Sequence, residues 1–223
     1  MVVNRVIGQA KRLTFEEVFP MVEGTEGGQW LNGVSVIPVK RGTNQFLFDV
    51  SEDAKTRYFF YGLKNVASIP DLGIPLKDAY GFVFTNNVLK ESPTVSLDKN
   101  ATVEIDSIFR QCKKLSYAHG LDTRMAKAPS WGYVSPFNEN GSNSLTLDLT
   151  PIKDSEGNLV EPWQFGVKVS FSDSILDHET AVYLLKHLIP GEGLTIKFSY
   201  STFATLTEDD IKIATDKGWS VAE

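Results

Sequence analysis

The sequence is poor in cysteine, in histidine and in long apolar runs. Cys112 is its only cysteine among 223 residues, which excludes an intrachain disulfide and a zinc site built from several thiolates. No segment approaches the roughly 20 consecutive apolar residues that a membrane helix needs, and residues 1–12 lack the apolar stretch of a secretory signal. We therefore expect no membrane partner and a protein that is made in a cytoplasm.

Catalytic signatures are also missing. The sequence has no phosphate-binding loop, dinucleotide fingerprint, nucleophile elbow or Cys-x-x-Cys pair. His178-Glu179 begins a zinc-protease motif, but Val182 stands where the second histidine is needed. Asp173, Asp177 and Glu179 could bind a divalent cation through oxygen atoms, although a helix N-terminus explains them better, and a Ser-His-Asp arrangement of distant residues stays open. We predict a protein that is not an enzyme, with no catalytic residue, no metal and no cofactor.

Acidic side chains outnumber basic ones, 28 against 22, which gives a formal net charge of −6. A nucleic-acid-binding domain is typically basic, so we expect no nucleic-acid partner. The hydrophobic content of 42 % is that of an ordinary globular protein.

What the sequence does contain is a period. From residue 51 onward, short apolar segments recur at intervals of 22 to 27 residues. This interval fits leucine-rich repeats, whose units span 20–29 residues. A unit of that length cannot bury its apolar face alone, so we expect the units to stack and their strands to lie parallel. The predicted strands centre on Leu72, Leu97, Leu121, Leu147, Val169 and Ile196.

Between and after these strands the pattern predicts helices. Apolar residues three positions apart indicate a short α- or 3₁₀-helix over 60–66 and over 109–115. A helix capped by Asp177 or Ser174 should follow the strand at 167–171, and a helix with a Thr207–Asp210 capping box should follow the strand at 194–198. Residues 131–143, which contain proline and glycine, are expected to form an insertion loop.

The first 50 residues form a separate region in this interpretation. Residues 34–39 and 45–50 are predicted to pair as a β-hairpin across the turn 40–44, and residues 13–19 to form a short helix. We accordingly divide the chain into a β-rich docking region, 1–50, and a repeat domain with a C-terminal cap, 51–223.

Three stretches of the sequence resemble a known family. Residues 108–116, Ile-Phe-Arg-Gln-Cys-Lys-Lys-Leu-Ser, followed by Leu121-Asp122-Thr123, resemble a unit of the BspA-type irregular leucine-rich repeats, and residues 60–72 resemble a degenerate copy. Residues 205–219 look like the C-terminal cap of such repeats in structural proteins of tailed bacteriophages. The resemblance implies an α/β fold, a leucine-rich-repeat-like half-solenoid with a parallel sheet and short helices, preceded by the small N-terminal β-hairpin region.

The same resemblance implies a non-enzymatic virion protein, a tail or head-appendage component that is assembled in the host cytoplasm. Its expected partners are copies of itself and other virion proteins, and the alternative is a module that recognises a host-surface glycan or protein. The candidate residues for such contacts are the aromatic residues Trp30, Trp131 and Tyr133, which lie in loop-like stretches. Packing onto the core is the competing explanation for these loops, and Trp163 and Trp219 are predicted to be core residues.

Overall fold

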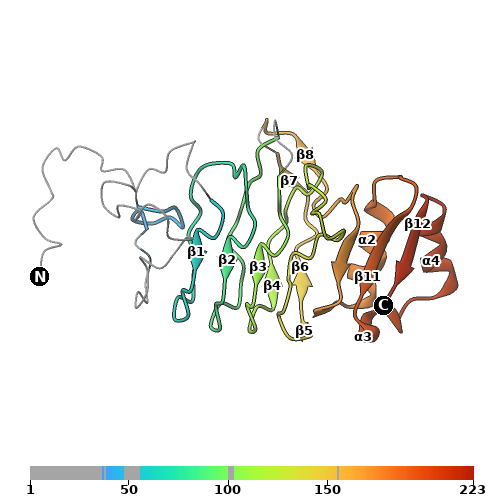
Figure 1. The fold of residues 1–223 in the computed structure, drawn as a ribbon. Coiled ribbons are helices and arrows are strands. Elements are labelled where there is room, and N and C mark those ends of the chain that lie inside the picture. The colour runs from blue at the N-terminus through green and yellow to red at the C-terminus, as the bar shows by residue number, and fades with distance from the viewer. Residues whose placement is uncertain (1–36, 38, 48–55, 100–102, 155) are drawn as a thin grey trace, which may run out of the picture.

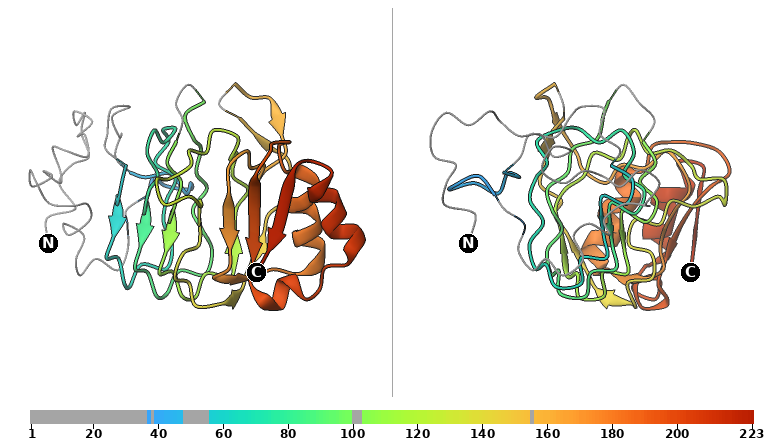
Figure 2. Two further views of the ribbon diagram at one scale, coloured as in Figure 1. Left: turned by 45° about the vertical axis from the view of Figure 1, so that its right-hand side comes forward. Right: turned by 60° about the vertical axis from the view of Figure 1, so that its left-hand side comes forward.

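The computed structural model describes residues 37, 39–47, 56–99, 103–154 and 156–223. Within these residues the fold is mixed α/β, with many short strands in parallel sheets, few helices and no closed barrel. The chain advances in successive turns, so that β1, β2 and β3 lie side by side, and the helices gather at the C-terminal end (Figure 1, Figure 2). The predicted parallel arrangement of the strands is confirmed.

The first sheet joins two-residue strands from three consecutive turns. β1 (Phe60–Tyr61), β2 (Val83–Phe84) and β3 (Phe109–Arg110) are parallel, and each strand begins directly beside the start of its neighbour. In every strand the first side chain is buried and the second is half-buried on the outer face. Consecutive turns therefore place equivalent side chains next to one another.

Residues with positive φ bound each of these strands. The left-handed region costs a residue with a Cβ roughly 1–2 kcal/mol, and a β-strand cannot continue through it. This explains why the strands are only two residues long. The positive φ values are at Tyr58, Gly81 and Ser107 before the strands and at Gly62, Thr85 and Gln111 after them.

Residues 131–143 were predicted to form an insertion loop, and this prediction is wrong. Their central part is a turn of the same stack. The amide N–H of Phe109 donates to the carbonyl of Pro136 at 2.9 Å, and Val134 forms a parallel bridge to Val169 on the other side. Proline is compatible with this place because only its carbonyl is used. The ring of Phe137 is buried in the core.

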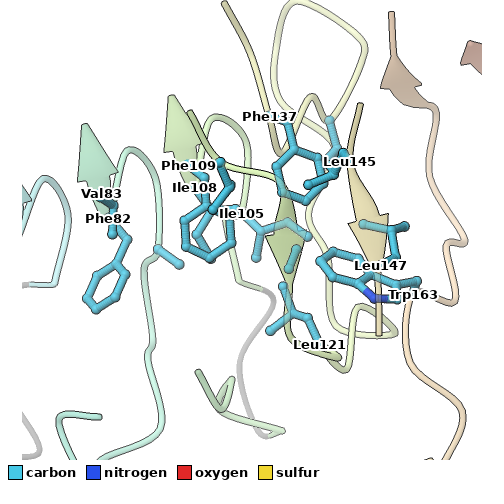
Figure 3. Close-up of a cluster of buried hydrophobic side chains, with 14 of the residues drawn as sticks. Phe82, Val83, Ile105, Ile108, Phe109, Leu121, Phe137, Leu145, Leu147 and Trp163 are labelled. Carbon is cyan, nitrogen blue, oxygen red and sulfur yellow. The ribbon is translucent and has the colours of Figure 1, made fainter. Parts of the chain in front are cut away.

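Phenylalanine rings from successive turns stack in that core. The centroids of Phe109 and Phe137 lie 5.8 Å apart with nearly parallel rings, and Phe171 lies 6.1 Å from Phe137 and 6.3 Å from Phe198. Trp163 packs against Phe137 and is completely buried (Figure 3). Apolar burial is therefore continuous from the middle turns to the C-terminal end.

A second buried row lies three residues beyond the starts of β1, β2 and β3 and beyond Phe137, and its residue type changes from turn to turn. The Asn86 side chain donates to the carbonyl of Val66 at 2.7 Å and accepts hydrogen bonds from the amides of Val88 and Leu89. Because buried polar groups need partners, these bonds tie the second turn to the first. The row consists of Leu63, Asn86, Cys112 and Asn140, and we call it the buried row.

Several predicted strand positions were wrong. Leu72, Leu97 and Leu121 are buried but lie outside the strands. The strands of these turns are instead β1, β2 and β3, two of which fall where short helices were predicted. The spacing of three residues that suggested a helix has another cause: a positive φ directly after the strand redirects the chain, so that both Phe60 and Leu63 are buried.

The C-terminal part agrees better with the predictions. β9 (Val169–Phe171), β11 (Leu194–Phe198) and β12 (Trp219–Ala222) form a parallel sheet in the order β12-β11-β9. The side chain of Asp177 caps α2 (His178–His187), and the predicted capping box begins α4 (Glu208–Thr215). A single helical turn, α3 (Tyr200–Phe203), lies between β11 and α4.

The remaining strands are short pairs along the stack. β4 (Tyr117–Ala118) pairs in parallel with β6 (Thr146–Leu147), which contains the predicted strand centre Leu147. β5 (Asn143–Ser144) pairs in parallel with β10 (Ser174–Ile175). β7 (Ile152–Lys153) and β8 (Leu159–Val160) form an antiparallel hairpin at the upper edge of Figure 1.

The predicted N-terminal hairpin is confirmed as far as the structure describes it. Val39 forms an antiparallel bridge to Phe46, and the chain turns between them with Gly42 at a φ of +75°. Residues 34–36, 38 and 48–50 of the hairpin lie outside the described residues, as do the helix predicted over 13–19 and Trp30. The division into 1–50 and 51–223 stays a prediction.

Candidate functional site

Trp131 lies on the surface and is held in place there. Its side chain is 57 % exposed, whereas Trp163 and Trp219 are buried as predicted. The Trp131 ring meets the ring of Tyr80 edge-on, with 6.0 Å between the centroids. Core packing therefore does not explain Trp131.

The carboxylate of Asp106, which contacts the segment after Trp131, is buried. Its Oδ1 accepts the amide N–H of Ser135 at 2.7 Å, and its Oδ2 accepts the hydroxyl of Ser107 at 2.9 Å. Burial raises the pKa of Asp106, and the hydrogen bonds from Ser135 and Ser107 oppose that shift. Asp106 thus ties residues 106–107 to the segment that carries Trp131.

Four further aromatic side chains extend from Trp131 across the outer face of the first sheet. The ring of Tyr80 meets that of Tyr58 at 5.3 Å, and Tyr58 meets Phe84 at 5.9 Å. Phe84 in turn stacks on Tyr61 at 4.8 Å with an angle of 14° between the rings. We call this set the aromatic surface; its members are Tyr58, Tyr61, Tyr80, Phe84 and Trp131.

The register of the turns builds this surface. Tyr61 and Phe84 hold the outward position of β1 and β2, so they stack when the strands pair. Gly81 makes room beside them, because a Cβ at this position would lie 2.6 Å from atoms of the Tyr58 ring. Its φ of +58° also favours glycine.

An arginine lies over a ring at each of two places. The Arg57 guanidinium is 4.4 Å from the Tyr80 centroid, and it pairs with Asp78 at 3.8 Å and Glu104 at 3.4 Å. The charge of Arg57 is therefore already balanced within the chain.

The Arg110 guanidinium lies 5.1 Å from the centroid of Phe84 and forms an ion pair with Glu139. Hydrogen bonds from Gln111 and Arg110 lower the pKa of Glu139, the bond from Gln111 having the larger effect. Gln111 also accepts a hydrogen bond from the Thr85 hydroxyl at 2.8 Å, so a polar row runs beside the aromatic surface.

The sequence-predicted residues are only partly brought together. Tyr133 is half-buried, and the Lys197 ammonium lies over its ring at 5.2 Å from the centroid. Sequence reasoning missed Tyr58, Tyr61, Tyr80 and Phe84. A signal for two of them was present, since Tyr61 and Phe84 each follow the apolar residue that begins a turn.

The groups that could carry chemistry have partners within the stack. His119 contacts Glu91 at 2.8 Å, His178 contacts Asp210 at 3.0 Å, and the Nδ1 of His187 lies 2.8 Å from the carbonyl of Tyr183. Cys112 is buried, and burial raises the pKa of its thiol to about 12. A thiol with so high a pKa is a poor nucleophile.

Two of the three acidic residues that could bind a divalent cation have structural roles instead. Asp177 accepts the amide N–H of Thr180 as the cap of α2, and Asp173 accepts that of Glu139 at 2.8 Å. Across the described residues, no group of three or more histidine, cysteine, aspartate or glutamate side chains is placed to hold a metal ion.

Residues 217–219, Lys-Gly-Trp, close the C-terminal end. The Lys217 ammonium donates to the carbonyls of Leu185, Lys186 and Leu188 at the end of α2. The Trp219 indole N–H donates to the carbonyl of Ile189 at 2.9 Å. These bonds satisfy helix-terminal carbonyls that lack partners within the helix, which gives this segment a structural role.

Compared with protein-family models, with curated proteins and with solved structures, the chain shows no match to any of them. In the part of the chain that the structure describes, no helix combines the length and apolar character needed to cross a membrane. A functional proposal for this protein therefore has to start from its own residues.

Proposed function

We propose that this chain is a non-enzymatic structural protein of a tailed bacteriophage particle, a tail or head-appendage component. It is assembled in the host cytoplasm and acts by docking to copies of itself and to other virion proteins. In this proposal the parallel turns form a leucine-rich-repeat-like half-solenoid, and residues 1–50 form the docking region. The similarity of residues 108–116 and 205–219 to such repeats and their caps supports the assignment.

The observation that carries the non-enzymatic part is the use of chemical groups as connectors between turns. Glu91 and His119 belong to different turns, as do Asp173 and Glu139, and each pair joins them. Asn86 and Asn140 use their amides on the backbone of adjacent turns. Groups held in this way stabilise a scaffold, which favours a structural role.

The test locates the protein and measures its assembly. Particles of the phage that encodes it are purified and probed with an antibody against this chain, and the mass of the isolated protein is measured in solution. We expect the protein in the particles and an oligomer with closed symmetry in solution. A strictly monomeric chain that is absent from particles would contradict the proposal.

A second function, recognition of a host-surface molecule, is favoured by Trp131. An exposed indole that already packs against the ring of Tyr80 loses little conformational freedom when it binds a ligand. The substitution Trp131→Ala removes this ring at an exposed position, so the fold should remain intact. Loss of binding to host cells by the folded variant is the expected result.

A further inference from the structure

We propose that the aromatic surface binds a neutral polysaccharide chain. This inference rests on the second proposed function, recognition, and names the class of ligand. It is argued from three properties of the surface: a fixed exposed ring, the balance of its charges and the polar row beside it.

The first property is the fixed, exposed ring of Trp131. Trp131 is 57 % exposed, and the ring of Tyr80 packs edge-on against it. The apolar C–H groups on one side of a sugar ring pack well against such an aromatic face, whereas the hydroxyl groups at its rim remain hydrated. Because the indole is already ordered, the ligand does not have to fix it.

The charges argue against an anionic ligand. Around the aromatic surface the two guanidinium groups of Arg57 and Arg110 face three carboxylates. Each guanidinium is paired and also lies over a ring, so among the described residues neither arginine is free to attract a sulfated, phosphorylated or uronic acid chain. The carboxylates are those of Asp78, Glu104 and Glu139.

The same ion pairs disfavour a dry protein interface. The core of a protein–protein interface is depleted of charged residues, and desolvating ion pairs is costly. Here the pairs stand among the rings, where a protein partner would have to cover them. A sugar can leave them in contact with water and use its hydroxyl groups as both donors and acceptors.

Beside the rings the chain supplies neutral hydrogen-bonding groups. The Thr85 hydroxyl and the Gln111 amide follow the outward residues of β2 and β3 and are half-buried. Their row runs from turn to turn, parallel to the stack. A sugar chain has an apolar face and a rim of hydroxyl groups, so it can contact both the aromatic surface and this polar row.

The experiment uses the full chain and a panel of defined probes. Cellohexaose, laminarihexaose and maltohexaose serve as neutral chains, and an oligogalacturonate and a heparin hexasaccharide serve as anionic ones. Binding is measured by isothermal titration calorimetry and by tryptophan fluorescence at low and at high salt. We expect at least one neutral chain to bind, with an affinity that salt does not change.

Three variants define the site. Trp131→Ala should weaken binding about tenfold or more, the effect typical of a central aromatic contact. Trp131→Phe keeps an aromatic ring but a smaller one, so an intermediate affinity is expected. Tyr200→Ala removes an aromatic side chain that is 75 % exposed on α3 and should leave binding unchanged.

The proposal is overturned if no neutral chain binds, if Trp131→Ala binds as tightly as the parent, or if the anionic chains bind instead with a strong salt dependence. Capture of a virion or host protein through Trp131, with none of the neutral chains bound, also overturns it. The virion assignment is judged separately, because the presence of the protein in particles does not depend on sugar binding.

Discussion

In the described part of residues 56–118 no strand exceeds two residues, whereas β11 in the C-terminal part has five. The C-terminal part also has α2 and α4, each with a capped N-terminus. The middle turns have positive-φ residues at their strand ends and rely on stacked rings and on the buried row. Two neighbouring parts of one stack are thus stabilised differently. Rows of side chains stabilise the middle turns, and regular backbone hydrogen bonding stabilises the C-terminal part.

The largest expected effect is at the ring that joins the two parts. Phe137 stacks between Phe109 and Phe171, so Phe137→Ala should lower the free energy of unfolding by about 3–5 kcal/mol, the usual cost of truncating a buried phenylalanine. Chemical denaturation measures this. Leu159→Ala, at a side chain that is 71 % exposed, is the control and should change stability by less than about 0.5 kcal/mol. A loss below about 1 kcal/mol for Phe137→Ala would show that the rings do not join the parts.

The next effect tests whether the middle turns depend on the buried row. Asn86→Leu keeps the number and branching of the side-chain heavy atoms and places at position 86 the residue type found at position 63, but it leaves the carbonyl of Val66 and two amides without partners. We expect a loss of roughly 2–3 kcal/mol. Asn87→Leu, at the exposed neighbouring position, should cost far less. Equal stability of the two variants in denaturation would contradict the role assigned to the row.

Two glycines sharpen the comparison between the parts. Gly62 has a φ of +74° but open space around it, so Gly62→Ala should cost about 1 kcal/mol from backbone strain alone. Gly218 has a φ of +81°, and its added Cβ would lie 2.6 Å from the carbonyl oxygen of Gly191, so Gly218→Ala should cost about 2 kcal/mol or more. Thermal unfolding of both variants checks the order, and the reverse order would refute it.

Acid should affect the two parts in opposite directions. Hydrogen bonds from Thr207, together with the contact from His178, lower the pKa of Asp210 to about 2, so its stabilisation is present above the ordinary pKa near 3.8 and is lost as the pH falls toward 2. Burial raises the pKa of Asp106, so its contribution is greatest below 3.8 and falls as the pH rises through the raised value.

Unfolding of the parent chain, Asp106→Asn and Asp210→Asn is followed from about pH 2 to pH 7. The difference between the parent and Asp210→Asn should shrink in acid, whereas the parent should gain relative to Asp106→Asn. Parallel pH profiles for both variants would contradict the assignment of opposite shifts.

The C-terminal part could be predicted because its signals are local. The caps at Asp177 and Thr207 lie within three residues of the amides they satisfy, and the alternation in 194–198 lies within one strand. In the middle turns the informative contacts join residues more than 20 positions apart, such as Asn86 and Val66. Apolar spacing alone could not distinguish a helix from a two-residue strand followed by a reversal.

The candidate site was predictable only at one residue for a similar reason. Trp131 stood out because a tryptophan beside glycine is conspicuous in any sequence. Tyr58 and Tyr80 join the surface through the register of the turns and through the missing side chain of Gly81, which no local pattern indicates. The buried carboxylate of Asp106 likewise becomes meaningful only when residues 131–135 are placed beside it.

The variation along the buried row bears on how the chain avoids assembling its turns in the wrong order. If the turns were identical, each could pair with any other turn, and a shifted pairing would cost no free energy. Here a displacement by one place would put Leu63 where the Asn86 side chain bonds three backbone groups. It could also put Cys112 where Asn140 accepts a hydrogen bond from a backbone N–H. Each turn is complementary only to its own neighbours. A misordered stack is therefore destabilised, because it leaves buried polar groups without hydrogen-bond partners.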